Sequence, residues 1–265
     1  TDLTGLTIGI VGVGNVGKRI EKTCKILGMN VLLNDPPRER AEGSSEFVSL
    51  ETIQKEADII TFHVPLNMTG EDATFHMVDE DFLQNLRKNP LIINSCRGEV
   101  CDSEAIYNAI EASDIKGFIA DCWENEPDIN LDLLNLCEYG TPHIAGYSKD
   151  GKANGTKMSV QAISRFFGLG INNWAPTDVE LPASTNIEID GNQRREYSVL
   201  AEAILSTYDI ENDDDDLRDS PLKFEQLRGD YPVRLEFNKY TIEAKNIEIK
   251  TIQVFVLRYQ RIPPI

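Results

Sequence analysis

The chain has 265 residues, enough for two domains with a substantial hydrophobic core. Hydrophobic residues make up 41% and charged residues 26% of it, as is usual for a globular protein, and no apolar run approaches the length of a membrane span. The formal net charge of −18 argues against nucleic acid or an anionic membrane as a partner. It also requires that a site for an anionic substrate collect arginines or lysines locally.

The cysteines are odd in number and scattered, mostly within apolar runs, at positions 24, 96, 101, 122 and 137. This pattern predicts buried free thiols in a reducing compartment rather than a disulfide framework or a metal site. No basic and then apolar leader opens the sequence, so we expect a cytoplasmic protein.

The first recognisable pattern is a strand, a glycine-rich turn, a helix and a second strand. A short apolar run at residues 8–11 predicts a buried parallel strand, and Gly-Val-Gly-Asn-Val-Gly follows at 12–17. Apolar residues then recur at helical spacing until Gly28, which is expected to end the helix. Residues 31–33 predict the second strand, which ends at Asp35.

This arrangement predicts a dinucleotide-binding turn. Gly12 would permit the tight turn, Gly14 would let the backbone approach a pyrophosphate, and Gly17 would let the helix pack closely on the strand. The pyrophosphate would accept hydrogen bonds from amides at the helix N-terminus. Asp35 would accept hydrogen bonds from the adenosine ribose and repel a 2′-phosphate, which favours NAD over NADP. The alternative is a structural βαβ turn that binds no ligand.

Beyond Asp35, predicted strands and helices alternate. Pro36-Pro37 is expected to force a turn. The predicted helices cover residues 50–56, 79–86 with Asp79 as N-cap, 102–110 with Asp102 or Ser103 as N-cap, and 151–168. The predicted strands cover residues 58–63, 91–94, 117–120 and 138–140. The alternation predicts an α/β fold, a Rossmann-type doubly wound parallel sheet with right-handed crossovers.

The pattern changes near Pro176. From there we expect a small α+β domain, with a helix over about 194–207, a short helix near 221–228 and β-like runs at 233–237 and 251–257. The acidic run Glu211–Asp216 is interpreted as a solvated loop in preference to a cation site. The predicted domains are a Rossmann domain over residues 1–176 and a C-terminal domain over residues 177–265.

Polar residues fall at or just after the carboxyl ends of the predicted strands, where open α/β sheets bind ligands. They are Asp35, His63, Ser95, Arg97, Asp121, Glu126 and His143. His143 has a side chain suited to accept a hydroxyl proton near neutral pH, and Glu126 could fix its tautomer and favour the imidazolium. Arg97 offers a planar fork for bidentate capture of a substrate carboxylate. Together they indicate oxidation of a hydroxy acid.

The segments that carry these residues resemble the D-2-hydroxyacid dehydrogenases. They are Gly12–Gly17 with Asp35, His63–Leu66, Asn94–Gly98, Asp121–Pro127 and Thr141–Gly146. The resemblance implies NAD as cofactor, Arg97 and Glu126 as active-site residues, His143 as the acid/base, Tyr147 as a substrate contact, and no metal. The NAD contacts that it implies are Gly12, Gly14, Asn15, Val16, Gly17, Asp35, Val64, Ser95, Cys96, Arg97, Asp121 and Gly146.

One position departs from the family pattern, and two histidines receive no chemical role. Val64 stands where relatives have a threonine, so only a backbone contact would survive there. His63 is expected to be structural rather than chemical. His76 lies in no motif and receives no role.

Further segments resemble one member of the family that acts on a small phosphorylated hydroxy acid and has an extra C-terminal dimerisation domain. They are residues 141–156, Asp35–Arg38, Phe224–Arg228 and Tyr231–Arg234. This likeness predicts a homodimer that forms through residues 177–265. Arg228 and Arg234 are interpreted as surface salt-bridge residues, with help to a phosphorylated substrate as the alternative.

The family's N-terminal substrate-binding lobe is absent from this sequence, so the chain as written is expected to bind NAD yet turn over poorly. Three alternatives remain open: another D-2-hydroxyacid dehydrogenase, for instance one acting on phosphoglycerate, an NAD-sensing binding protein, and an assembly fragment without activity. The C-terminal tail argues against the first alternative. Arg97, Glu126 and His143 favour an enzyme over the second.

Overall fold

The computed structural model describes residues 3–44, 46–177, 179, 184–192 and 196–246, without the side chains of residues 196, 197 and 244. Its backbone contacts divide the chain into two units. The first unit runs up to Ile144 and also contains Ile210–Gly229, and the second contains Ala145–Asp209 and the chain from Asp230 onward. This division differs from the single boundary predicted at residue 176.

The first unit alternates strands and helices, as the sequence predicted. Its elements are β1 (Thr7–Val11), α1 (Gly17–Ile26), β2 (Asn30–Asn34), α2 (Pro36–Glu42), α3 (Leu50–Glu56), β3 (Ile59–Phe62), α4 (Glu80–Gln84), β4 (Leu91–Asn94), η1 (Gly98–Val100), α5 (Ser103–Glu111), β5 (Gly117–Ala120), α6 (Leu131–Leu136), β6 (Tyr139–Gly140), α9 (Ile210–Asp219), η2 (Pro221–Lys223) and α10 (Phe224–Gly229).

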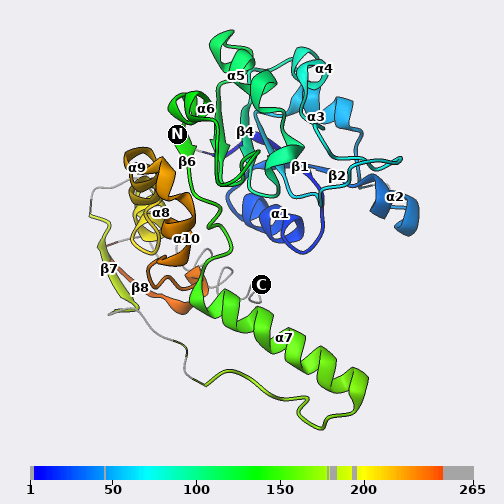
Figure 1. The fold of residues 1–265 in the computed structure, drawn as a ribbon. Coiled ribbons are helices and arrows are strands. Elements are labelled where there is room, and N and C mark those ends of the chain that lie inside the picture. The colour runs from blue at the N-terminus through cyan, green and yellow to red at the C-terminus, as the bar shows by residue number, and fades with distance from the viewer. Residues whose placement is uncertain (1–2, 45, 178, 180–183, 193–195, 247–265) are drawn as a thin grey trace. The chain divides into compact units, whose positions relative to one another are not determined.

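Six strands form one parallel sheet in the order β2-β1-β3-β4-β5-β6 (Figure 1). The chain runs outward from β1 to β2, returns to β3 on the other side of β1, and continues to β6. This is the doubly wound order, and it confirms the predicted Rossmann-type fold. Such sheets bind ligands beyond the carboxyl ends of the strands, where the strand order reverses. Here that point lies between β1 and β3.

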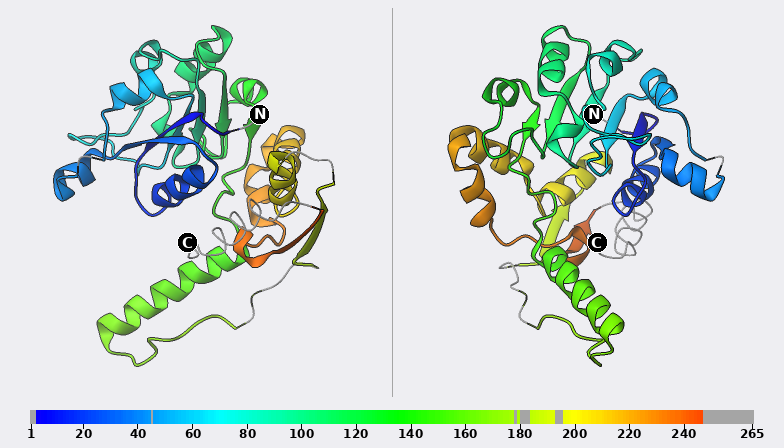
Figure 2. Two further views of the ribbon diagram at one scale, coloured as in Figure 1. Left: turned by 180° about the vertical axis from the view of Figure 1, so that it is seen from behind. Right: turned by 45° about the vertical axis from the view of Figure 1, so that its right-hand side comes forward.

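The side chains of β1 alternate between the two faces of the sheet, as the pleat requires. Ile8 and Ile10 pack in a cluster with Cys24 of α1. Val11 packs in a second cluster with Ile53 of α3, and that cluster continues through the buried side chains of α4, α5 and α6. In Figures 1 and 2, α1 accordingly covers one face, and α3, α4, α5 and α6 cover the other. The glycine-rich turn therefore leads from a buried strand into a helix that is packed on the sheet.

Helix starts follow local sequence signals. The carboxylate of Asp79 accepts a hydrogen bond from Phe82 N, and that of Asp102 accepts bonds from the first turn of α5, as predicted. The turn expected at Pro36-Pro37 is wrong, because α2 begins there with Asp35 as its N-cap. Prolines fit the first turn of a helix, where their missing N–H removes no intrahelical hydrogen bond.

The acidic run is helical rather than a solvated loop, which corrects the sequence interpretation. It lies in α9, where Asp214 is 8% exposed and accepts hydrogen bonds from Gly140 N (2.6 Å) and Arg218 Nε (2.7 Å). Leu217 of α9 and Phe224 of α10 are buried in the same core cluster as α3 to α6. Residues that were expected in the C-terminal domain thus complete the core of the first unit.

The second unit has a different character. Its elements are α7 (Lys149–Phe167), β7 (Asn186–Asp190), α8 (Glu196–Leu205), η3 (Phe237–Lys239) and β8 (Thr241–Lys245). β7 and β8 pair in parallel, and the buried apolar cluster found among its described residues consists of Ile189, Val199 and Ala203. The long helix expected at 151–168 is confirmed and begins two residues earlier.

One predicted strand of the second unit is wrong. The run at 233–237 has no strand, because its backbone bonds to the start of α7 instead. Lys149 N donates to Arg234 O, and Asp150 Oδ1 accepts from Glu236 N, both at 2.8 Å. The other β-like run, 251–257, lies outside the described residues.

α7 carries apolar side chains that the described chain leaves open to solvent. Met158 is 61% exposed and Phe166 is 81% exposed. Patches of this kind in a folded chain mark interaction surfaces. None of the helices in the described part of the chain is long and apolar enough to cross a membrane.

Candidate active site

The glycine-rich turn has the close packing that a dinucleotide-binding turn needs. Gly12 has φ of +88°, and a Cβ atom there would lie 2.6 Å from His63 O at the end of β3. A Cβ on Gly17 would collide with Gly12 O, so α1 could not approach β1 with any larger residue. A Cβ on Gly14 would point into open space. A ligand can therefore approach the backbone at Gly14, and the turn fits the pyrophosphate of NAD.

Asp35 ends β2 beside this turn. Its Oδ2 accepts a hydrogen bond from Val13 N (2.8 Å), and its Oδ1 accepts from Arg38 N (3.1 Å). Two carboxylate oxygens have further acceptor capacity, so these bonds leave room for ribose hydroxyls. Arg38, the nearby cation, is occupied by Glu42 (2.8 Å) and by Val13 O (2.7 Å). The charge beside the ribose position is therefore that of the aspartate, which supports the predicted preference for NAD.

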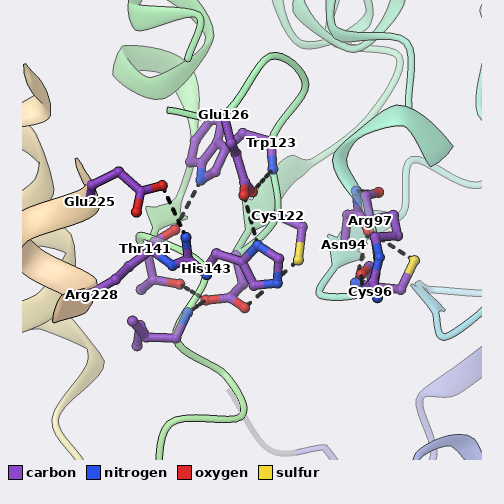
Figure 3. A network of polar contacts seen from close by, with 12 residues as sticks. Asn94, Cys96, Arg97, Cys122, Trp123, Glu126, Thr141, His143, Glu225 and Arg228 are labelled. Carbon is purple, nitrogen blue, oxygen red and sulfur yellow. Dashed lines mark hydrogen bonds and ion pairs between the residues drawn. The ribbon is translucent and has the colours of Figure 1, made fainter. Parts of the chain in front are cut away.

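His143 and Glu126 form a hydrogen-bonded pair. His143 Nδ1 lies 2.8 Å from Glu126 Oε2, while Glu126 Oε1 accepts from Trp123 N (2.8 Å) (Figure 3). The hydrogen bond to Glu126 raises the pKa of His143 above its ordinary value, against the lowering effect of burial. With Nδ1 bound to the carboxylate, Nε2 is the nitrogen left to exchange a proton with a substrate. The structure thus brings together two of the three predicted catalytic side chains.

Asp121 fixes the turn on which His143 stands. Its Oδ1 accepts hydrogen bonds from Thr141 Oγ1 and from Ile144 N, both 2.7 Å long, and its backbone O accepts from His143 N (2.8 Å). His143 has φ of 53°, a left-handed conformation that is uncommon outside glycine. The carboxylate, 7% exposed, therefore holds His143 in place, and its predicted contact with NAD stays a prediction.

Arg97 lies on a separate loop, Ser95–Glu99, which we call the Arg97 loop. Asn94 shapes it, since its amide donates to Arg97 O (2.8 Å) and its Oδ1 accepts from the Cys96 backbone N–H and thiol. The thiol of Cys96 thus points inward, and only its backbone could meet NAD. The Arg97 side chain is exposed, and Figure 3 shows it apart from the His143–Glu126 pair.

Gly98 sets the distance between the Arg97 loop and the segment Asp121–Pro127, which we call the Glu126 loop. A Cβ atom on Gly98 would collide with the backbone carbonyl of Trp123. The two loops therefore touch backbone to backbone, so their relative placement is fixed without a side chain between them. Arg97 and Glu126 are positioned by this contact.

α10 brings a further cation near His143. Arg228 pairs with Glu225 (3.2 Å), and its guanidinium lies 6.0 Å from the ring centre of Phe224. Its positive charge acts to lower the pKa of His143, in opposition to Glu126. Figure 3 shows Arg228 beside the turn that carries His143. The sequence interpretation of Arg228 as a surface salt-bridge residue missed this proximity. It arises because α10, although late in the sequence, belongs to the first unit.

The other two histidines differ from His143. His63 Nε2 lies 3.0 Å from Thr61 Oγ1, and burial lowers its pKa to about 4, so it stays neutral, in keeping with the expected structural role. His76, to which the sequence assigned no role, lies between two carboxylates: Nε2 is 2.6 Å from Glu124 Oε1, and Nδ1 is 3.5 Å from Asp102 Oδ2.

One group in the described part of the chain offers metal-ligand atoms, namely Cys122, Glu126 and His143, all within 4.8 Å of one another. The 2.8 Å contact between Glu126 and His143 is a hydrogen-bond distance. Two ligand atoms on a tetrahedral zinc with bonds of about 2.0 Å would stand roughly 3.3 Å apart. Burial raises the pKa of the Cys122 thiol, so it is protonated. The group has the geometry of an acid/base pair, and all five cysteines are free and buried, as predicted.

The remaining predicted contacts divide between the two units. Asn15 and Val16 are exposed at the glycine-rich turn, and Val64 and Ser95 are half-buried after their strands. Gly146 and Tyr147 belong to the second unit, where Lys152 Nζ lies 3.5 Å from the centre of the Tyr147 ring. The roles of these residues toward NAD and substrate stay predictions.

Comparison with known proteins matches most of the chain. Residues 1–145 match the model of the D-isomer specific 2-hydroxyacid dehydrogenase, NAD binding domain, and residues 180–254 match a domain of unknown function. The erythronate-4-phosphate dehydrogenase of Bacteroides thetaiotaomicron is 47% identical over 89% of this chain and 65% of that protein. That of Porphyromonas gingivalis is 40% identical over 91% of this chain and 65% of that protein. The chain thus spans about two thirds of the length of these relatives.

Solved structures carry the same fold. The D-lactate dehydrogenase from Aquifex aeolicus, complexed with NAD and lactic acid, matches with a TM-score of 0.52 and 28% identity, over 62% of this chain and 54% of that chain. A D-lactate dehydrogenase from Sporolactobacillus matches with a TM-score of 0.54 and 28% identity, over 68% and 58%. NAD is therefore the cofactor of this domain type, as predicted, and the chain belongs to the D-isomer-specific 2-hydroxyacid dehydrogenase family.

Proposed function

We propose that this chain is part of an NAD-dependent dehydrogenase that oxidises 4-phospho-D-erythronate at C2 to (R)-3-hydroxy-2-oxo-4-phosphobutanoate. The observation that carries the proposal is the hydrogen-bonded pair of His143 and Glu126 on an NAD-binding domain. The substrate follows from the likeness to 4-phosphoerythronate dehydrogenase that the sequence suggested, and from the erythronate-4-phosphate dehydrogenases at 40–47% identity. The pathway this implies is vitamin B6 biosynthesis.

The chemistry balances with one acid/base residue. His143 Nε2 accepts the proton of the C2 hydroxyl, and the C2–H bond breaks with its electron pair as the C2–O bond becomes a carbonyl. Bound NAD supplies the hydride acceptor. Glu126 stabilises the imidazolium that results, since its carboxylate accepts the Nδ1 proton of His143 in a hydrogen bond. The proton then leaves to solvent. In the reverse reaction His143 takes up a proton from solvent and donates it to the carbonyl oxygen.

An anionic substrate needs cations in a chain whose net charge is −18. Arg97 is exposed at the sheet edge and offers its fork to the carboxylate next to C2. Arg228 lies near enough to influence His143, which makes it the candidate partner for the phosphate. This assignment favours the alternative that the sequence left open for Arg228 over a surface salt bridge alone.

Two other functions make different predictions. Another D-2-hydroxyacid dehydrogenase, such as one acting on phosphoglycerate, would use the same three residues with a different substrate. An NAD-sensing binding protein would bind the cofactor without turnover. The His143–Glu126 pair favours an enzyme, because binding of NAD alone requires neither an acid/base residue nor a carboxylate that raises its pKa.

The proposal includes a homodimer in the cytoplasm. The exposed apolar side chains of α7 and the two-stranded sheet of the second unit are surfaces that a second copy would cover. A chain cut after Pro176 would test the dimer poorly, since it would also remove Leu217 and Phe224 from the core of the first unit. Substitution of Phe166, exposed on α7, by glutamate tests it without disturbing that core. The buried free cysteines support a reducing compartment.

The experiment compares substrates on the full-length protein. NADH formation is followed by absorbance while the 2-oxo acid is trapped chemically, with 4-phosphoerythronate, 3-phosphoglycerate and unphosphorylated erythronate as substrates. We expect the highest kcat/KM with 4-phosphoerythronate, and formation of both products slowed by on the order of 10²–10⁴ in His143→Ala. Preference for phosphoglycerate would support the first alternative. NAD binding without turnover of any of the three would support the second.

A further inference from the structure

His76 lies where the two loops of the active site meet. Its backbone N–H donates to Glu99 O (2.8 Å), at the end of the Arg97 loop. Its side-chain Nε2 is 2.6 Å from Glu124 Oε1, in the Glu126 loop. One residue, 48 positions before Glu124 in the sequence, therefore joins the backbone of one loop to a side chain of the other.

Glu124 is held on both of its carboxylate oxygens. While Oε1 faces His76, Oε2 accepts from Ser103 N at the start of α5 (2.8 Å). A helix N-terminus favours a negative charge, so this second bond fixes Glu124 against a rigid element. Asp102, the N-cap of α5, lies 3.5 Å from His76 Nδ1 on the opposite side of the ring. The His76 ring thus lies between two carboxylates: that of Asp102 at the start of α5 and that of Glu124 in the Glu126 loop.

Glu124 is two residues from Glu126, and the backbone beside Glu124 contacts the carboxylate of the acid/base pair. Trp123 N, the amide just before Glu124, donates to Glu126 Oε1, and Glu126 Oε2 meets His143 Nδ1, both at 2.8 Å. A shift of the backbone at Trp123 and Glu124 would therefore move the carboxylate that orients His143. Figure 3 shows Trp123, Glu126 and His143 in succession along this path.

The backbone of His76 is itself strained. It has φ of 47°, in the left-handed region that residues other than glycine rarely adopt. Its ring stacks on Phe75, with the ring centres 4.0 Å apart. Strain of this kind persists only where surrounding contacts fix the residue, and at His76 those contacts are the two active-site loops.

We propose that His76 is a positioning residue of the active site: it holds Glu124, and through the Trp123 backbone it keeps Glu126 in place to orient His143. The proposal rests on the proposed role of His143 in proton transfer, but it makes a claim about geometry that can be measured without turnover. It assigns a role to the one histidine that no sequence motif marked.

Two substitutions of His76 distinguish the effect of its side-chain contact with Glu124 from the effect of its left-handed backbone. His76→Asn suits the left-handed backbone, which asparagine tolerates, but is too short to reach Glu124. His76→Gln is longer and keeps an N–H donor for the carboxylate. Glu124→Gln weakens the same contact from the other side. Circular dichroism and NAD binding show that each variant is folded.

The first readout is the NMR titration of the His143 ring in the 265-residue chain, which has three histidines. The charges that act on this ring are those of Glu126, Asp121 and Arg228. We expect the pKa of His143 to move toward its ordinary value in His76→Asn and in Glu124→Gln, and to stay near that of the parent chain in His76→Gln. An unchanged titration in both of the weakened variants would overturn the proposal.

The second readout is kcat in the full-length protein. His76→Asn should lower kcat roughly 5- to 50-fold with the KM for NAD unchanged, because small misplacements of reacting groups have effects of this order. His76→Gln should restore most of the rate. In a Glu126→Gln background, His76→Asn should cause no further loss, and an equal loss in both backgrounds would refute action through Glu126. A shifted titration in a protein without turnover would refute the proposed function and leave this inference standing.

Discussion

The two units of the chain bury their apolar side chains in different ways. In the first unit, both faces of a six-stranded sheet are covered, and residues as distant as Ile53 and Phe224 share one core cluster. In the second unit, the described core cluster has three members, and Phe166 on α7 is 81% exposed. The first unit buries its apolar side chains within itself and carries the His143–Glu126 pair. The second unit leaves apolar side chains exposed, which the proposed homodimer would cover.

The largest effect on turnover is expected from substitution of the acid/base residue in the first unit. His143→Ala should lower kcat of the full-length protein by on the order of 10²–10⁴, the usual contribution of a general acid/base, while NAD affinity stays near that of the parent. His63→Asn is the matched control, because His63 is neutral and bonded to Thr61. Near-parental turnover in His143→Ala would remove it from proton transfer.

A pair of phenylalanines tests the contrast in burial directly. Phe224→Ala should destabilise the chain by about 3–5 kcal/mol, since Phe224 is 1% exposed in the first unit's core. Phe166→Ala should change the stability of the monomer by no more than about 0.5 kcal/mol, but should weaken the dimer. Urea unfolding and light scattering measure the two effects. Equal destabilisation by both substitutions would contradict the difference between the units.

Arg97→Lys keeps the charge of the site but removes the planar fork. We expect a loss of about 1.5–3 kcal/mol in transition-state stabilisation, calculated from kcat/KM, because hydrogen bonds to charged groups contribute that much. Arg87→Lys, on an exposed stretch away from the carboxyl ends of the strands, is a control. Unchanged kcat/KM in Arg97→Lys would show that the fork binds no carboxylate.

Cofactor choice is expected to depend on one charge. Asp35→Asn keeps one acceptor oxygen, enough for one of the two hydrogen bonds from Val13 N and Arg38 N, and it removes the charge that repels a 2′-phosphate. The ratio of NADP to NAD affinity should therefore rise by roughly 10-fold, as for the loss of one charged hydrogen bond. Titration of both cofactors by calorimetry measures it. An unchanged ratio of NADP to NAD affinity would show that the adenosine ribose does not bind beside Asp35.

The smallest effect concerns pH. The hydrogen bond to Glu126 raises the pKa of His143, and a base must be neutral to accept a proton, so kcat/KM for oxidation should fall as the pH drops through that raised pKa. In Glu126→Gln the inflection should move to lower pH. The same pair also stabilises the folded state. Its contribution to the free energy of unfolding is fully present below about pH 6.5, the pKa of histidine in an unfolded chain, and is lost as the pH rises through the raised pKa of His143. An inflection that does not move would assign it to another group.

The sequence predicted best where signals are local. Gly12 and Gly17 serve a turn within six residues, and the caps at Asp79 and Asp102 bond within their own first turns. His143 and Glu126 were predicted because each follows a strand of the same parallel sheet. That edge is common to all the strands, so the pair could be inferred without coordinates.

The sequence failed where contacts are distant. Asp214 lies in an acidic run that looks solvated, yet it is buried because Gly140 N and Arg218 satisfy its carboxylate. β7 and β8 were missed because they pair in parallel across more than 50 positions. His76 carries no local signal, since its ring contacts a residue 48 positions away. Such contacts depend on tertiary packing, which periodicity does not encode.

The central claim is that hydride leaves C2 of 4-phosphoerythronate for bound NAD while His143 takes the hydroxyl proton. The most direct measurement uses 4-phosphoerythronate deuterated at C2 with the full-length protein, followed by NMR of the reduced cofactor. The account predicts one deuterium at C4 of the nicotinamide for each 2-oxo acid formed, and formation of both products slowed by on the order of 10²–10⁴ in His143→Ala. Formation of 2-oxo acid without deuterium in the cofactor, or deuterium transfer undiminished in His143→Ala, would contradict it.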